Sequence, residues 1–180
     1  MKNNLSKQGL TMVCATLLFA SHAWTQEHRW AGRTLDDVEW SIHEAIASLP
    51  TYGVFDTINF EVQGKTVTLS GLVVGEKVKH RAERAISRLS SVERVINHIE
   101  VLPSSRRDDA LRMNVYRAIY PKKDDPSRQT DPPIHIIVKN GWVTLEGVVD
   151  SDADRRRLSL QAMQVTAHLS DNLRVVPDQQ

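Results

Sequence analysis

Apolar residues repeat at helical spacing between Thr34 and Pro50, and this stripe predicts the first helix of the chain. Thr34-Leu-Asp-Asp37 has the form of a capping box, in which a hydroxyl and a carboxylate satisfy N–H groups at a helix start. Pro50 ends the helix, because proline cannot continue its hydrogen bonding. Apolar and polar residues then alternate from Ile58 to Val62, which is the period of a half-buried strand.

A hairpin and a second helix follow this strand. Gln63-Gly64-Lys65 predicts a turn, after which residues 66–71 alternate again as a second strand. Apolar residues return to helical spacing from Val78 to Leu89, and a third alternating segment runs from Val95 to Val101. The order of elements in this unit is therefore αββαβ.

The second half of the chain repeats this order. Val67-Thr-Leu-Ser-Gly71 is matched by Val143-Thr-Leu-Glu-Gly147, and Asn140-Gly141 is a strong signal for a type I′ hairpin turn. Ser105-Arg-Arg-Asp108 matches the first helix cap. We therefore predict two tandem modules, residues 34–103 and 104–180. Each module has its own set of apolar stripes, so each is expected to have its own core and to unfold separately.

The apolar stripes also predict the architecture of each module. Every helix and strand has one apolar side, and an α+β layer of two helices on one face of a three-stranded sheet buries all of them. The crossover helix makes the second and third strands parallel, so the sheet is mixed. Gly71 and Gly147 are predicted to be structural, at points where the strand bends or another backbone approaches closely.

These residues resemble the BON-domain family. The resemblance rests on VTLSG and VTLEG, on the charged helix after them, and on Val95-x-Asn97-x-Ile99-x-Val101, and it covers nearly all of the chain after the leader. In the second copy Leu169 and Asp171 stand where Val95 and Asn97 stand, which leaves the boundary of its third strand open. The resemblance implies the fold described above, attachment to phospholipid surfaces, and envelope maintenance under osmotic stress.

The first residues are predicted to be an export signal rather than part of the fold. Lys2 and Lys7 precede a short apolar run at residues 10–20, and Ser21-His22-Ala23 has the small residues that a signal peptidase requires. We predict a signal peptide at residues 1–23, a flexible leader at 24–33 and a periplasmic location. The alternatives are an uncleaved anchor, for which the run is short, and lipidation of Cys14, for which Val13 is a poor neighbour.

Composition is that of a globular protein, with 41% hydrophobic and 25% charged residues. Cleavage of the signal would remove two lysines and change the formal net charge from +1 to −1, so net charge indicates no partner. The only cysteine lies in the signal, so no disulfide is expected. Nucleic acid is not expected as a ligand, because a periplasmic protein does not normally meet it.

No catalytic pattern is found in the sequence. The seven histidines are scattered, without cysteine or carboxylate neighbours at metal-ligand spacing, and no nucleophile or phosphate-loop motif is present. The acidic pairs Asp36-Asp37, Asp108-Asp109 and Asp152/Asp154 lie at predicted helix starts, where carboxylates complement the helix dipole. We therefore predict a protein that is not an enzyme, with no cofactor, catalytic residue or metal site.

Two groups of basic residues are candidates for lipid binding. The first is a stripe along the second helix of the first module: Lys77, Arg81, Arg84 and Arg88. The second lies around the long connection of the second module and combines aromatic and basic residues, as the lipid interface favours: Tyr116, Tyr120, Lys122, Lys123 and Arg128. The alternative for both groups is an ordinary solvated surface.

Three classes of function follow. The sequence favours a periplasmic envelope protein that binds anionic phospholipid surfaces or envelope proteins. The alternative is a protein–protein adaptor without lipid binding. An enzyme of unrecognised type is the third class, and it would require a cleft of convergent polar groups that the sequence does not display.

Overall fold

The computed structural model describes residues 37–50, 52–121 and 132–176. These described residues belong to one compact unit, which contains the helices and strands of both predicted modules. The predicted signal peptide, the leader and the cap at Thr34 lie outside the described residues, as do Lys122, Lys123 and Arg128.

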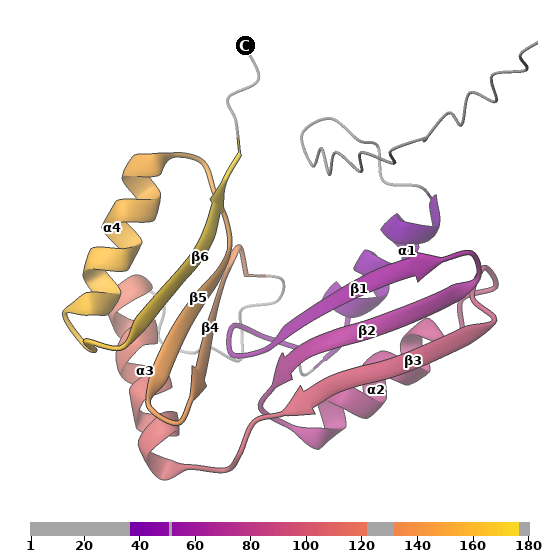
Figure 1. Cartoon of the computed structure of the whole chain (residues 1–180), viewed down its shortest axis with the longest axis horizontal. Helices are drawn as coiled ribbons and strands as arrows, with labels where there is room; N and C mark the ends of the chain where they lie inside the picture. The colour runs from indigo at the N-terminus through magenta and orange to yellow at the C-terminus, as the bar shows by residue number, and fades with distance from the viewer. Residues whose placement is uncertain (1–36, 51, 122–131, 177–180) are drawn as a thin grey trace, which may run out of the picture. The chain divides into compact units, whose positions relative to one another are not determined.

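The first module has the predicted αββαβ order (Figure 1). It consists of α1 (Asp37–Ala47), β1 (Thr57–Gln63), β2 (Thr66–Val73), α2 (Glu76–Ile86) and β3 (Arg94–Val101). β1 pairs antiparallel with β2, and β2 pairs parallel with β3, so the sheet is mixed as predicted. Both helices cover one face of the sheet, and the core between the layers includes Ile42, Leu69 and Ile86.

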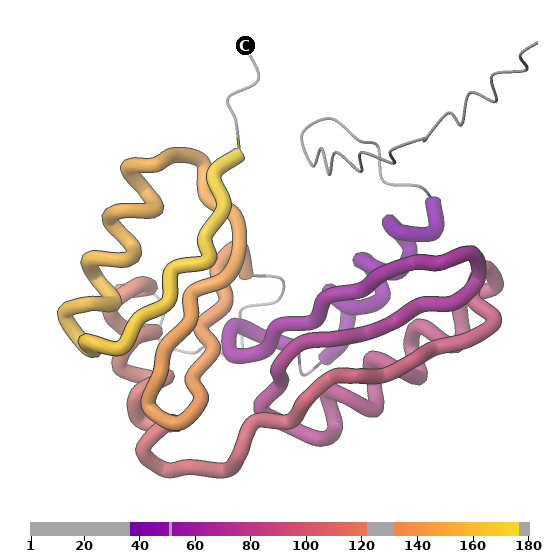
Figure 2. The backbone as a smooth tube through the Cα atoms, in the orientation of Figure 1, coloured from indigo at the N-terminus to yellow at the C-terminus, as the bar shows by residue number. Residues whose placement is uncertain are grey.

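The second module repeats this topology, as the chain trace also shows (Figure 2). It consists of α3 (Arg106–Ile119), β4 (Ile134–Lys139), β5 (Trp142–Val149), α4 (Asp152–Met163) and β6 (Leu169–Val175). Val143 is in register with Leu169, as Val67 is with Val95 in the first module. This shared register places the start of the third strand, and the predicted α+β fold of two modules is confirmed.

Gly71 and Gly147 lie where neighbouring strands approach too closely for a side chain. A Cβ atom on Gly71 would lie 2.2 Å from the carbonyl oxygen of Thr57, and one on Gly147 would lie 2.0 Å from that of Pro133. The two glycines have φ values of +128° and +133°, which side chains of L-residues rarely tolerate. The matching glycines therefore set the approach of β1 to β2 and of β4 to β5.

A polar side chain ties the third strand to the second helix in each module. Asn97 on β3 donates to a carboxylate oxygen of Glu83 on α2, at 3.0 Å. Its counterpart Asp171 on β6 accepts from the guanidinium of Arg155 at 3.1 Å and from the hydroxyl of Ser159 at 2.8 Å, both on α4. The substitution of Asn by Asp thus reverses the direction of the hydrogen bonds and keeps the connection.

The core of the second module contains a residue of the first. Val54, in the turn between α1 and β1, is 1% exposed and belongs to the same cluster as Tyr116. Its carbonyl oxygen accepts from the backbone N–H of Ile136 at 2.7 Å, and Thr57 donates to Glu146 at 2.8 Å. The modules therefore share part of a core, which differs from the expectation of two self-contained cores.

Asp56 holds the turn that carries Val54. Its carboxylate accepts from the backbone N–H groups of Gly53 at 3.1 Å and Val74 at 2.8 Å. The side chain is buried, and desolvation raises the pKa of Asp56 although both hydrogen bonds act to lower it. A buried carboxylate thus stabilises a turn that has no regular secondary structure.

Candidate anion-binding cleft

Helix α2 separates apolar and basic residues onto different faces. Val78, Ala82 and Ile86 are buried against the sheet. Because 3.6 residues make one turn, Arg81 and Arg84 fall on a different part of the helix surface, and Arg88 lies in the turn directly after α2. Three of the four predicted stripe residues are thereby brought to the side of α2 that faces the end of α1.

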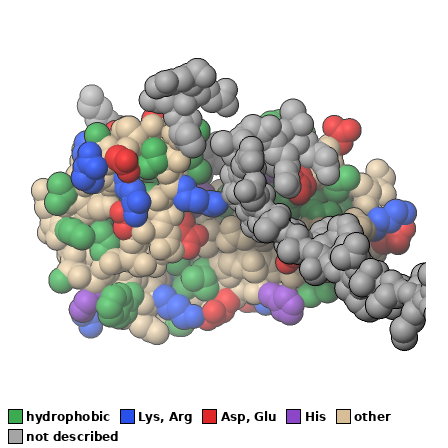
Figure 3. All heavy atoms as spheres, turned by 45° about the horizontal axis from the view of Figure 1, so that its top comes forward, with side chains coloured by type: hydrophobic (Ala, Val, Ile, Leu, Met, Phe, Trp, Pro, Cys, Tyr) green, Lys and Arg blue, Asp and Glu red, His purple; other side chains and the backbone are tan. Residues whose placement is uncertain are grey.

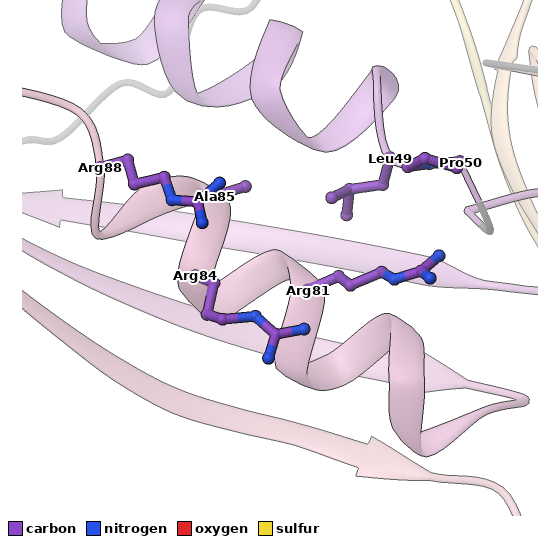
Figure 4. A pocket seen from close by; sticks show the side chains of 6 residues that line it. All are labelled: Leu49, Pro50, Arg81, Arg84, Ala85 and Arg88. Carbon is purple, nitrogen blue, oxygen red and sulfur yellow. The ribbon is translucent and has the colours of Figure 1, made fainter.

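The three arginines line a cleft of about 400 Å³. Figure 4 shows Arg81 and Arg84 on α2 and Arg88 just after its end, with Leu49 and Pro50 on the segment that follows α1. Ala85 completes the lining between the arginines. α1 ends at Ala47, three residues before Pro50, and the turn that follows places Leu49 and Pro50 as the apolar wall of the cleft. Lys77, the fourth residue of the predicted stripe, is exposed but does not line the cleft.

The two carboxylates of α2 interact with residues outside the cleft. Glu83 accepts from Asn97 on β3, and Glu76 lies 3.2 Å from the imidazole of His80. Within the described residues, no ion pair is found for Arg84 or Arg88, and both side chains are exposed. The cleft therefore combines positive charge with an apolar wall, which suits an anionic group attached to an apolar body.

The family model of the BON domain matches residues 41–103 and 108–177. The chain belongs to the BON-domain family. Both matched segments coincide with the modules that the structure shows, so each module is a BON domain. Membership of this family indicates a non-enzymatic, envelope-associated role. No curated protein matches the chain.

Two solved structures are similar to this BON protein. CdsD, a structural protein of the type III secretion system of Chlamydia trachomatis, is 15% identical over 80% of this chain and 63% of its own, with a TM-score of 0.33. The C-terminal domain of CdsD is 15% identical over 77% of this chain and 64% of its own, with a TM-score of 0.30. The chain thus spans less than two thirds of either structure, and these likenesses do not bear on its function.

The second predicted lipid-binding group is only partly on the surface. Tyr116 is fully buried in the core of the second BON domain, so the prediction that it contacts lipid is corrected. Tyr120 is half-buried, its ring centre lies 5.2 Å from that of Tyr116, and its hydroxyl donates to the carbonyl oxygen of Ile134 at 3.0 Å. Helical spacing explains both positions, because Tyr116 lies four residues after the buried Arg112 and Tyr120 four residues after Tyr116.

The second BON domain has no equivalent basic face on its crossover helix. Arg155 is paired with Asp171 at 3.1 Å, and Arg157 with Asp154 at 2.8 Å. Hydrogen bonds from Arg157 and Ser151 lower the pKa of Asp154. Arg155 therefore connects α4 to β6 and Arg157 pairs within α4, whereas Arg81, Arg84 and Arg88 of the first domain line a cleft.

The acidic residues at the helix starts have structural partners. Ser105 caps α3 by accepting from the N–H of Asp108 at 3.2 Å, as the sequence predicts. The carboxylate of Asp108, which the sequence analysis assigned to the helix start, accepts from the N–H groups of Asn140 and Gly141 at 2.9 Å each. It therefore fixes the β4–β5 turn. The type I′ signal at Asn140-Gly141 marks the turn, but the sequence does not show which carboxylate reaches it.

The described part of the chain contains no cluster of three side chains arranged to hold a metal ion. None of the helices within residues 37–50, 52–121 and 132–176 is long and apolar enough to cross a membrane. On the face drawn in Figure 3, basic and acidic side chains are interspersed among hydrophobic ones. The arginine cleft is therefore the feature on which a functional proposal can be built.

Proposed function

We propose that the chain is an exported periplasmic protein that binds anionic phospholipids through the cleft of its first BON domain and serves envelope maintenance, including osmotic stress. The observation that carries the proposal is that Arg81, Arg84 and Arg88 line one cleft together with the apolar residues Leu49, Pro50 and Ala85. The predicted export signal supports the location, because it would deliver the protein to the compartment in which these headgroups are exposed.

The residues of the cleft match the two parts of a phospholipid headgroup region. Guanidinium groups donate paired hydrogen bonds to phosphate oxygens, which makes arginine well suited to phosphate recognition. Leu49, Pro50 and Ala85 provide apolar contact for the glycerol and the first carbons of an acyl chain. Lys77 lies outside the cleft, so its expected contribution is a general electrostatic attraction to the anionic membrane surface.

Cosedimentation with vesicles tests the proposal. The full chain without its signal is mixed with phosphatidylglycerol vesicles and with neutral phosphatidylcholine vesicles, at low and at high salt. Each cation near an anionic surface contributes about 1 kcal/mol, so replacing the three cleft arginines by glutamine should weaken binding by about 100-fold at low salt. Binding of the unmodified chain should also weaken at high salt, because the charges are screened.

A matched control separates the cleft from net charge. Arg106, Arg107 and Arg117 are exposed on α3, and their replacement by glutamine removes the same number of charges. If this control variant binds as weakly as the cleft variant, the attraction is not specific to the cleft. If the unmodified chain does not bind anionic vesicles at low salt, the lipid proposal fails and the protein–protein adaptor replaces it.

Mass spectrometry of the exported protein tests the location. A mature N-terminus at Trp24 in the periplasmic fraction is expected, because Ser21-His22-Ala23 precedes it. An intact or acylated N-terminus in the membrane fraction would show that the chain is anchored instead.

A further inference from the structure

The second BON domain carries an exposed aromatic pair that its core does not use. Trp142, the first residue of β5, is 58% exposed. Its ring stacks on that of His168, with 4.8 Å between the ring centres and 28° between the planes. His168 is held beside Trp142 because its carbonyl oxygen accepts from the N–H of Val143 at 2.9 Å. A broad flat surface is thus presented to solvent at one end of the sheet.

Uncharged polar side chains continue from this ring along the face of the sheet that the helices leave uncovered. Thr144 is two residues after Trp142 and is in register with Ser170 on β6, so all three side chains lie on one face. Asn172 follows on the same face, with its side-chain oxygen 3.5 Å from the hydroxyl of Ser170. Ser170 and Asn172 are exposed, and Thr144 is half-buried. The face therefore offers donors and acceptors beside a ring.

The first BON domain does not carry this combination. The registers align Val67 with Val143 and Val95 with Leu169, which places Thr66 at the position of Trp142 and Arg94 at that of His168. Ile96 and His98 stand in place of Ser170 and Asn172. The two domains share a fold, so the aromatic and polar residues of the second are not a requirement of that fold.

We propose that this face, formed by Trp142, His168, Thr144, Ser170 and Asn172, binds carbohydrate, with a pyranose ring of a glycan strand stacked on Trp142. One face of a pyranose consists of C–H groups, which pack against an aromatic ring, while its hydroxyls require neutral donors and acceptors at the edge. Thr144, Ser170 and Asn172 supply those groups along the direction of two strands. An extended chain of sugars could therefore follow the strands away from the ring.

The chemistry of the face favours a glycan over the ligand of the arginine cleft. Thr144, Ser170 and Asn172 are neutral, and the nearest carboxylate on this face, that of Glu146 in register with Asn172, accepts a hydrogen bond from Thr57 at 2.8 Å. Lys139, which is in register with Trp142 across the hairpin, is paired with Glu100. An anionic headgroup would find little attraction here, whereas a neutral sugar needs none. The proposal is independent of phospholipid binding.

Two measurements on the full chain test the proposal. The first is an NMR titration with an N-acetylglucosamine oligosaccharide, and the second is cosedimentation with insoluble chitin. We expect the indole N–H signal of Trp142 to shift, binding to persist at high salt, and Trp142→Ala to weaken binding by about tenfold through loss of the ring contact. Asn172→Ala should weaken binding by about threefold through loss of one hydrogen bond, without affecting folding because the side chain is exposed.

Trp40 provides the matched control. It is 59% exposed and also lies beside a histidine, with 6.3 Å between its ring centre and that of His43. Trp40→Ala and the cleft variant should both bind the oligosaccharide as the unmodified chain does. The proposal is overturned if the unmodified chain binds neither probe, if Trp40→Ala weakens binding as much as Trp142→Ala, or if Asn172→Ala binds unchanged. Should Trp142→Ala fail to fold, the result for Asn172→Ala decides.

Discussion

Replacing Gly147 by alanine should lower the denaturant concentration at which the chain unfolds much more than replacing Gly141 or Gly53 by alanine. The added Cβ would lie 2.0 Å from the carbonyl oxygen of Pro133 and 3.0 Å from its carbonyl carbon. Both distances are below any ordinary contact, and the atoms belong to the backbone of the segment leading into β4, which cannot rotate away. The start of β4 must therefore separate from β5, where Ile134 is in register with Gly147.

Two physical terms add at this position. A non-glycine residue at a φ of +133° costs about 1–3 kcal/mol by itself. Loss of strand pairing and of the packing behind it adds to this, so we expect a total above about 4 kcal/mol, which is a large part of the stability of a typical domain. For a chain of this size, that loss corresponds to a fall of roughly 8–16 °C in Tm.

Two other glycines separate these terms. Gly141 has a φ of +82° with no atom within 4 Å of the added Cβ, so Gly141→Ala should cost about 1–2 kcal/mol. Gly53 has open space and no positive φ, so Gly53→Ala should be neutral or stabilise the chain slightly. Urea denaturation followed by circular dichroism ranks the three variants. If Gly147→Ala costs no more than Gly141→Ala, the close backbone approach does not constrain this position.

Two further predictions concern the turn shared by the domains and the buried carboxylates. Val54→Ala should lower the free energy of unfolding by about 2 kcal/mol, because Val54 is buried in the core of the second domain. It should also reduce the hydrogen-exchange protection of β4 and β5, although the substitution lies in the first domain. A loss of protection confined to β1–β3 would contradict the shared core. Burial raises the pKa of Asp56 above its ordinary value of 3.8, so its contribution to stability is present at low pH and is lost as the pH rises through the raised value. For Asp171, burial is outweighed by hydrogen bonds from Ser159, the N–H of Leu173 and Arg155, which lower the pKa, so its contribution is lost as the pH falls through the lowered value. We would measure the unfolding free energy of the unmodified chain and of each variant between about pH 3 and pH 7. The value for the unmodified chain minus that for Asp56→Asn should fall as the pH rises, whereas its value minus that for Asp171→Asn should rise. Equal slopes for the two differences would refute the assignment.

The fold could be predicted from the sequence because its signals are local. Apolar spacing changes between the helical and the alternating period at each element, and the repeat of VTLSG as VTLEG shows that the order occurs twice. The matching glycines are also local signals, because a residue without a side chain inside a strand indicates a close approach. The approaching atom, a carbonyl oxygen in both modules, is seen only in the structure.

The site could be predicted only in part, because periodicity shows which residues share a helix face and not what lies opposite. It grouped Lys77 with Arg81, Arg84 and Arg88, but the end of α1 faces only the three arginines. It grouped Tyr116 with surface residues, although the helix buries it.

The order of elements in the two αββαβ modules could be read from the sequence, because each helix and strand has its own local period of apolar residues. Tertiary structure alone decided that Val54 completes the core of the second domain and that Trp142 stacks on His168. It also decided that Glu83 is directed to Asn97 while the arginines beside it line a cleft. Each of these contacts joins residues that are distant in the chain and carry no mutual periodicity, so only the packing of complete elements brings them together.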